Sequence, residues 1–174
     1  GESSSLLFGS IQHLSPSTNS FSVRRALLAR DARLDWVTAD TGGRLLLSSV
    51  DSSLEGQGSS AFTKMMFFGS GSQHFDFDVS AGHKAPDTTS DISSRGALDG
   101  KAKMVFRGLV KIHKDAPRSS GYQKEDTLLL SPDAEADPVP SLEIDNNDVR
   151  CSHGTTVGQV ERDKLFYLMA RGLG

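Results

Sequence analysis

Short runs of alternating apolar and polar residues recur along most of the chain, and each is followed by a turn-rich stretch. Residues 75–79, for example, read Phe-Asp-Phe-Asp-Val, so one face is apolar and the other polar, as in a half-buried β-strand. The separators are rich in Gly, Asp, Asn and Pro, which are typical of turns. The pattern predicts strands at 22–28, 33–38, 44–50, 64–68, 74–79, 88–93, 103–113, 127–130, 142–144 and 148–153.

Two segments are predicted to be longer loops. They are 115–123 and 132–140, and the second is acidic and contains three prolines. Many short strands separated by turns leave three all-β architectures open: a sandwich, a closed barrel or a stacked solenoid. Because the runs vary in length and show no strict repeat, the pattern alone slightly favours a sandwich.

The end of the chain has the periodicity of a helix. Residues 161–172 begin with acids and carry Arg171 near the end, which matches the helix dipole. Leu165, Leu168 and Met169 form an apolar stripe at helical spacing, and Gly172 suits the position just after a helix. We therefore expect one short C-terminal helix.

Composition narrows the class of protein. A chain of 174 residues with a net charge of −3 is long enough for one domain, and its mixed charges do not suggest binding to nucleic acid or to a membrane surface. A single cysteine excludes an internal disulfide and suits a reducing compartment. The sequence contains neither a phosphate-binding glycine loop nor the nucleophile motif of hydrolases.

The candidate chemistry lies at Cys151 and His153. Both belong to one predicted strand, and residues two apart in a strand project from the same face. A thiolate beside an imidazole suits iron, zinc or copper, although a lone cysteine is more often a small buried hydrophobic residue. Asp148 is a candidate for orienting the imidazole, with turn formation as the alternative. Structural or solvated roles are expected for His74, His83 and His113.

Several motifs resemble one known family. The run 142–172 contains LEI, then DV-x-CSHG-x-TVG, then LFYL-x-x-RG, and His83, Pro86, Thr88 and Ser90 form H-x-x-P-x-T-x-S. These motifs resemble the core domain of the SufB/SufD family, the scaffold subunits of the SUF iron–sulfur cluster assembly system, over residues 32–172. The CSHG sequence is similar to the SufD side of the family. At 125–127 the chain has Glu-Asp-Thr where the family often has Asn.

The resemblance implies a right-handed parallel β-helix for residues 1–160, in place of the sandwich. Phe75, Phe77 and Val79, and Leu142 with Ile144, are then expected to point inward. Residues 161–174 are implied to be the first helix of a C-terminal helical domain. In the family that domain docks the SufC ATPase, so we expect the main docking surface to lie outside this chain.

The resemblance also implies a function: a non-catalytic scaffold subunit that pairs through its β-helix core with a SufB-like subunit. A transient iron–sulfur cluster, or iron, would be shared at the interface, with Cys151 as a sulfur or iron ligand and His153 as an imidazole ligand. One thiolate cannot complete a conventional cluster, so no stably bound cofactor is expected in this chain alone. A homodimer in place of that pair is an open alternative. The implied location is the cytoplasm, or the plastid stroma in a eukaryote.

Two other classes of function stay open. The first is a β-helix that serves only for protein–protein interaction, with Cys151 buried and inert. The second is a β-helix enzyme acting on polysaccharide, which would need carboxylates clustered on one face, whereas the acids here fall mostly in turns.

Overall fold

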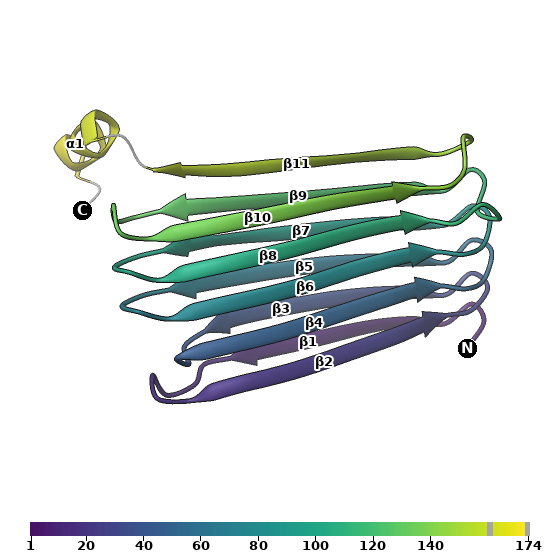
Figure 1. Ribbon diagram of the computed structural model, residues 1–174, viewed down its shortest axis with the longest axis horizontal. Coiled ribbons are helices and arrows are strands. Elements are labelled where there is room, and N and C mark those ends of the chain that lie inside the picture. The colour runs from purple at the N-terminus through teal and green to yellow at the C-terminus, as the bar shows by residue number, and fades with distance from the viewer. Residues whose placement is uncertain (160–161, 173–174) are drawn as a thin grey trace.

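The chain coils into a β-solenoid whose successive strands alternate between two parallel sheets (Figure 1). The computed structural model describes residues 1–159 and 162–172. Sheet A has the order β1-β3-β5-β7-β9-β11, and sheet B has the order β10-β8-β6-β4-β2. The strands of sheet A are β1 (Ser5–Gln12), β3 (Arg33–Thr41), β5 (Ser60–Gly69), β7 (Thr89–Leu98), β9 (Ser120–Leu129) and β11 (Arg150–Gln159). Those of sheet B are β2 (Asn19–Leu28), β4 (Leu45–Leu54), β6 (His74–His83), β8 (Lys103–Ile112) and β10 (Glu135–Ile144).

This architecture confirms the parallel solenoid that the family resemblance implied, and the sandwich favoured by the pattern alone is wrong. Strand partners lie one full coil apart, but the coils differ in length. Arg33 pairs with Ser60, 27 residues later, whereas Thr89 pairs with Ser120, 31 residues later. Because the turns absorb this variation, the strands stay in register although the sequence has no fixed period.

The core lies between the two sheets, where every second side chain of each strand points inward. Phe75, Phe77 and Val79 are completely buried, which confirms their predicted inward orientation. Leu142 is half-buried against the core, whereas Ile144 is 44% exposed. Both belong to β10, the edge strand of sheet B, so neighbours cover them on one side only.

Each of the ten predicted strands overlaps one observed strand, but the two predicted loops are too long, because only residues 115–119 and 132–134 of them lie between strands. Strand β9 begins at Ser120 inside the first, and β10 begins at Glu135 inside the second. Pro138 and Pro140 lack N–H groups, which an edge strand tolerates because one of its sides is unpaired. Strand β1 was not predicted, and its inward residue Phe8 packs edge-on against Trp36 of β3.

The predicted C-terminal helix is confirmed as α1 (Arg162–Ala170). Gly172 has a φ of 83°, the left-handed conformation expected just after a helix, and its N–H donates to the Met169 carbonyl. Leu168 and Met169 of the predicted apolar stripe are exposed. Glu161 and the boundary at residue 160 lie outside the described residues, as does the side chain of Leu165, so the division into 1–160 and 161–174 stays a prediction.

Gly96 provides a test of core packing. A Cβ atom at this inward position of β7 would lie 2.4–2.5 Å from the ring of Phe67, too close for real atoms. We expect Gly96→Ala to lower the free energy of unfolding by about 1–3 kcal/mol, measured by urea denaturation. Gly82→Ala is the matched control, because its Cβ would meet no atom within 4 Å. Equal losses in the two variants would contradict this packing.

Candidate functional site

The structure places Cys151 and His153 on the inward-facing side of β11, the edge strand of sheet A. Their register partners on β9 are Gly121 and Gln123. Cys151 is half-buried and packs against the hydrophobic core, whereas His153 is exposed. The prediction that the two side chains project from one face of a strand is therefore confirmed. Their roles as metal ligands stay a prediction.

Gly121 allows the Cys151 thiol to approach the backbone of the strand beneath it. A Cβ atom built on Gly121 would lie 3.4 Å from Cys151 Sγ, 3.5 Å from Ser90 Oγ and 2.5 Å from a methyl group of Val110. Burial raises the pKa of the Cys151 thiol, and a hydrogen bond from the backbone N–H of Gly121 partly opposes this shift. The thiol is thus the resting form in this chain, and a bound metal would have to displace its proton.

Three buried polar side chains lie on the inner face of sheet A in the two coils that precede β11, and the sequence analysis did not identify them as candidates. Gln123 and Glu125 of β9 are each only 2% exposed, and Ser94 of β7 is completely buried. Gln123 lies in register beneath His153, and Glu125 lies in register above Ser94. The alternation of Gln123, Glu125 and Thr127 was a usable signal, but it fell across the boundary of a wrongly predicted loop.

Asp148 takes part in a turn. Its N–H donates to Asn146 Oδ1 at 2.8 Å, and its carbonyl accepts from the N–H of Arg118 at 2.6 Å. These bonds support the turn interpretation over the role of orienting His153. Within residues 1–159 and 162–172, no group of three or more His, Cys, Asp or Glu side chains is arranged to hold a metal ion.

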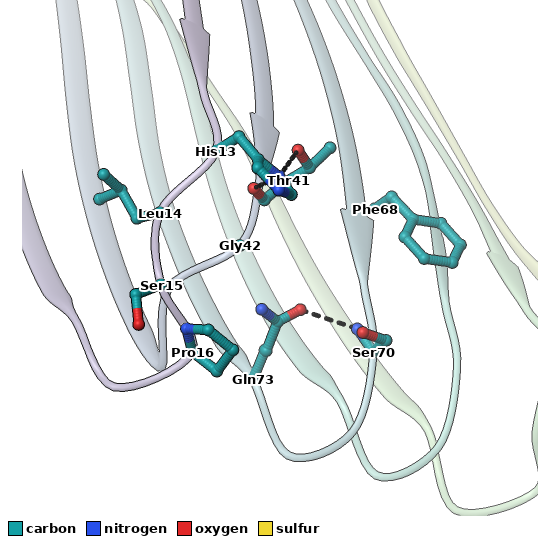
Figure 2. Close-up of a pocket in the computed structure, with 9 residues that line it drawn as sticks. All are labelled: His13, Leu14, Ser15, Pro16, Thr41, Gly42, Phe68, Ser70 and Gln73. Carbon is teal, nitrogen blue, oxygen red and sulfur yellow. Dashed lines mark hydrogen bonds between the residues drawn. The ribbon is translucent and has the colours of Figure 1, made fainter.

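A surface cavity of about 500 Å³ lies at the opposite edge of the solenoid, between the loops that follow β1, β3 and β5 (Figure 2). Its polar groups bond to one another. His13 Nδ1 lies 2.9 Å from the Thr41 carbonyl oxygen, and Gln73 bonds with the Ser70 N–H and the Gly43 carbonyl. The cavity is remote from Cys151, which lies at the start of β11. Because the polar groups of the cavity bond to one another, the cavity reflects the packing of these loops.

Comparison with known proteins decides the family. All 174 residues match the family described as "SUF system FeS cluster assembly, SufBD core domain". The chain belongs to the SufB/SufD family. It is 30% identical over 174 residues to the iron–sulfur cluster assembly protein SufD of Bacillus subtilis, covering 99% of this chain and 40% of that protein.

Other relatives agree with this membership. An iron–sulfur cluster assembly SufBD family protein of Staphylococcus saprophyticus is 28% identical over 166 residues, covering 95% of this chain and 36% of that protein. One of Mycobacterium tuberculosis is 30% identical, covering 95% of this chain and 20% of that protein. This SufB/SufD chain thus spans two fifths or less of these relatives. Membership implies a role in iron–sulfur cluster assembly.

In the part of the chain that the structure describes, no helix is long and apolar enough to cross a membrane.

The H-x-x-P-x-T-x-S motif of this SufB/SufD chain forms a buried hydrogen-bond network. His83 is completely buried, with Nδ1 2.7 Å from Thr88 Oγ1 and Nε2 2.8 Å from Ser90 Oγ. Thr88 Oγ1 also lies 2.7 Å from Ser119 Oγ in the next coil. The network ties the loop before β7 to the start of β9, so His83 has the predicted structural role.

Burial of His83 makes the stability of the chain depend on pH. Desolvation lowers the pKa of His83 from 6.5 to about 4. Between these two pH values, His83 binds a proton in the unfolded chain but not in the folded chain. We expect the free energy of unfolding to fall as the pH is lowered from 6.5 to 4, with His83 accounting for about 3 kcal/mol. Urea denaturation across this range would measure the slope.

His83→Asn removes the titrating group and keeps a polar side chain in place. We expect this variant to be less stable at neutral pH, with a shallower decline on acidification. His13→Asn is the control, because His13 is exposed. If His83→Asn keeps the slope of the unchanged chain, His83 is not the group responsible.

Proposed function

We propose that this chain is a non-catalytic scaffold subunit, on the SufD-like side of the family, that pairs through its β-helix core with a SufB-like subunit. Cys151 and His153 then ligate iron, or part of a nascent iron–sulfur cluster, at the shared interface. The observation that supports this most directly is their position: both project from one side of β11, which is an edge strand in the part of the chain that the structure describes.

Counting ligands supports a shared site. An iron–sulfur cluster needs four protein ligands, thiolates or a mixture of thiolates and imidazoles. Cys151 and His153 provide two, and the chain has no second cysteine. The remaining ligands therefore have to come from outside these 174 residues, and an edge strand is where a partner has access.

The edges of the solenoid also suit pairing with a partner. Among the described residues, β11 pairs only with β9 and β10 pairs only with β8, so each strand has one side whose backbone N–H and C=O groups meet no other strand. Val139 and Val157 on these strands are substantially exposed. A partner that covers both strands satisfies the backbone groups and encloses Cys151. A SufB-like subunit is the partner we propose, with a second copy of this chain as the alternative.

The remaining parts of the proposal rest on the family. The SufC ATPase would supply the energy and would dock mainly on a helical region outside this chain. The location would be the cytoplasm, or the plastid stroma. The cluster or iron is cargo that passes through the site.

The test is anaerobic reconstitution with iron and sulfide in the presence of the SufB-like partner. We expect Cys151→Ala and His153→Ala each to reduce the iron and sulfide retained after desalting at least fivefold, while the two chains still co-elute, because each loses a ligand. Ser152→Ala, on the opposite face of β11, and His13→Ala are the controls and should load normally. Full loading of both site variants would contradict the proposal.

A second candidate function, interaction without metal ligation, is favoured by the packing of Cys151 against the core. In that case the thiol is a small apolar residue and CSHG is a structural signature of the strand. Alkylation of the native chain separates the two functions. If the Cys151 thiol of the native chain reacts with iodoacetamide at a tenth or more of the rate measured in the denatured chain, it is accessible to a metal. Full protection of the thiol favours the interaction module.

A further inference from the structure

Charged side chains on the outer face of sheet B, and in the turns that follow its strands, pair with opposite charges in the neighbouring coil. Each of the four contacts between neighbouring strands of this sheet has at least one such ion pair. In order from β2 to β10, the pairs are Arg25–Asp51, Lys84–Glu55, Arg107–Asp76, Lys103–Glu135 and Lys111–Glu143. A charge on this side of the solenoid is thus compensated by the coil stacked above or below it.

The segment 133–148, which comprises β10 and the adjoining turns, is strongly acidic. It contains six acids and no Lys, Arg or His, and all six acids are exposed. Because the whole chain has a net charge of only −3, the negative charge is concentrated in this segment. Glu135 and Glu143 pair with lysines of β8. Within the described residues the other four acids form no ion pair, and they are Asp133, Asp137, Asp145 and Asp148.

These four acids lie where the stack of sheet B stops. Among the described residues β10 pairs only with β8, so one side of β10 has no neighbouring coil (Figure 1). In the inner coils the basic partner of an acid belongs to the adjacent coil, as Lys103 does for Glu135. Basic side chains for Asp137 and Asp145 would therefore have to belong to a segment that stacks on β10.

Backbone hydrogen bonds cannot hold the middle of this edge. The N–H of Glu135 donates to the Ala102 carbonyl at 3.1 Å, on the side of β8. Since successive N–H groups of a strand point to opposite sides, the N–H groups of the even-numbered residues of β10 face its free side. Pro138 and Pro140 are even-numbered and have no N–H to donate. A partner therefore contacts the middle of β10 chiefly through side chains.

A second copy of this chain does not supply basic groups through the same edge. In a symmetric dimer the same surface of both copies meets, so the segment 133–148 would face its own six acids. Like charges that lie opposite one another destabilise the pairing of strands. Neither copy could donate a backbone hydrogen bond at Pro138 or Pro140. The edge thus disfavours a symmetric homodimer and favours a partner of different sequence.

We propose that the β10 edge, defined as residues 133–148, docks a basic edge of a different chain, which places Lys and Arg side chains opposite Asp137 and Asp145. This inference rests on the proposed function and deepens it, because it gives the chemistry by which the SufB-like subunit is recognised. Charges around an interface steer association and select the partner. Since β11 is the other edge strand of the last coil, a partner selected in this way also covers Cys151 and His153.

The test compares two double variants that change the net charge equally. Asp137→Asn with Asp145→Asn removes two unpaired acids of the β10 edge. Asp78→Asn with Asp99→Asn is the matched control, because it removes two exposed acids from inner coils. The dissociation constant and the association rate for the SufB-like partner are measured by biolayer interferometry at about 50 and about 500 mM salt.

We expect the edge variant to raise the dissociation constant at least fivefold at the lower salt concentration, chiefly through slower association. At the higher salt concentration the change should be less than twofold, because salt screens exposed charges. The control variant should change the constant less than twofold under both conditions.

The outcomes separate this inference from the proposed function. If the edge variant binds the partner as the unchanged chain does, while reconstitution still depends on Cys151 and His153, the inference is overturned and the proposed function stands. Equal weakening in both double variants would also overturn it, because the effect would then follow from net charge alone. If the unchanged chain self-associates more tightly at low salt and the edge variant does not, the edge docks a second copy instead. If the unchanged chain binds no SufB-like subunit at either salt concentration, the proposed pairing fails and this inference fails with it.

Discussion

The stacking of each strand on its register partner in the next coil is the constraint on which the whole structure depends. An inward side chain is buried by the residues directly above and below it, as Phe77 is between Ser48 and Phe106. Stability therefore comes from contacts between neighbouring coils, and it ends where the coils end. β11 has a partner on one side only. For this reason Cys151 is only half-buried and His153 is exposed, although they occupy positions that would be core positions in an inner coil.

The same stacking means that inward residues at the same register position in successive coils have to fit one another. Where a row carries aromatic residues, as at Phe67, the neighbouring coil needs a glycine, and Gly96 provides it. Where buried side chains are polar, they pair with one another: the hydroxyl groups of Thr88 and Ser90 bond with His83, and the Thr88 hydroxyl bonds with that of Ser119 in the next coil. Polar side chains are thus tolerated inside the solenoid when they form hydrogen bonds with one another. The unpaired atoms of Gln123 and Glu125 stand out against this background.

Under the proposed function, two ligands on an edge strand suit a protein that passes its metal on. A site in which one chain supplies every ligand binds tightly and releases slowly, whereas a site divided between two surfaces can open when the surfaces separate. Burial raises the pKa of the Cys151 thiol, so under the same proposal its proton would compete with the metal for the sulfur. Both properties follow from the position of the strand at the edge.

The sequence by itself determined the all-β class, ten of the strands, the C-terminal helix and the shared face of Cys151 and His153, because alternation and turn chemistry are local properties. It determined the family as well, since the CSHG and LFYL motifs carry that information. The parallel stacking followed from the family resemblance and not from the residue pattern. Only the tertiary structure decided that the proline-rich segment is an edge strand and that Gln123 lies beneath His153. Those facts depend on the register between residues about 30 positions apart. Turns of variable length set this register, and no local sequence pattern predicts it.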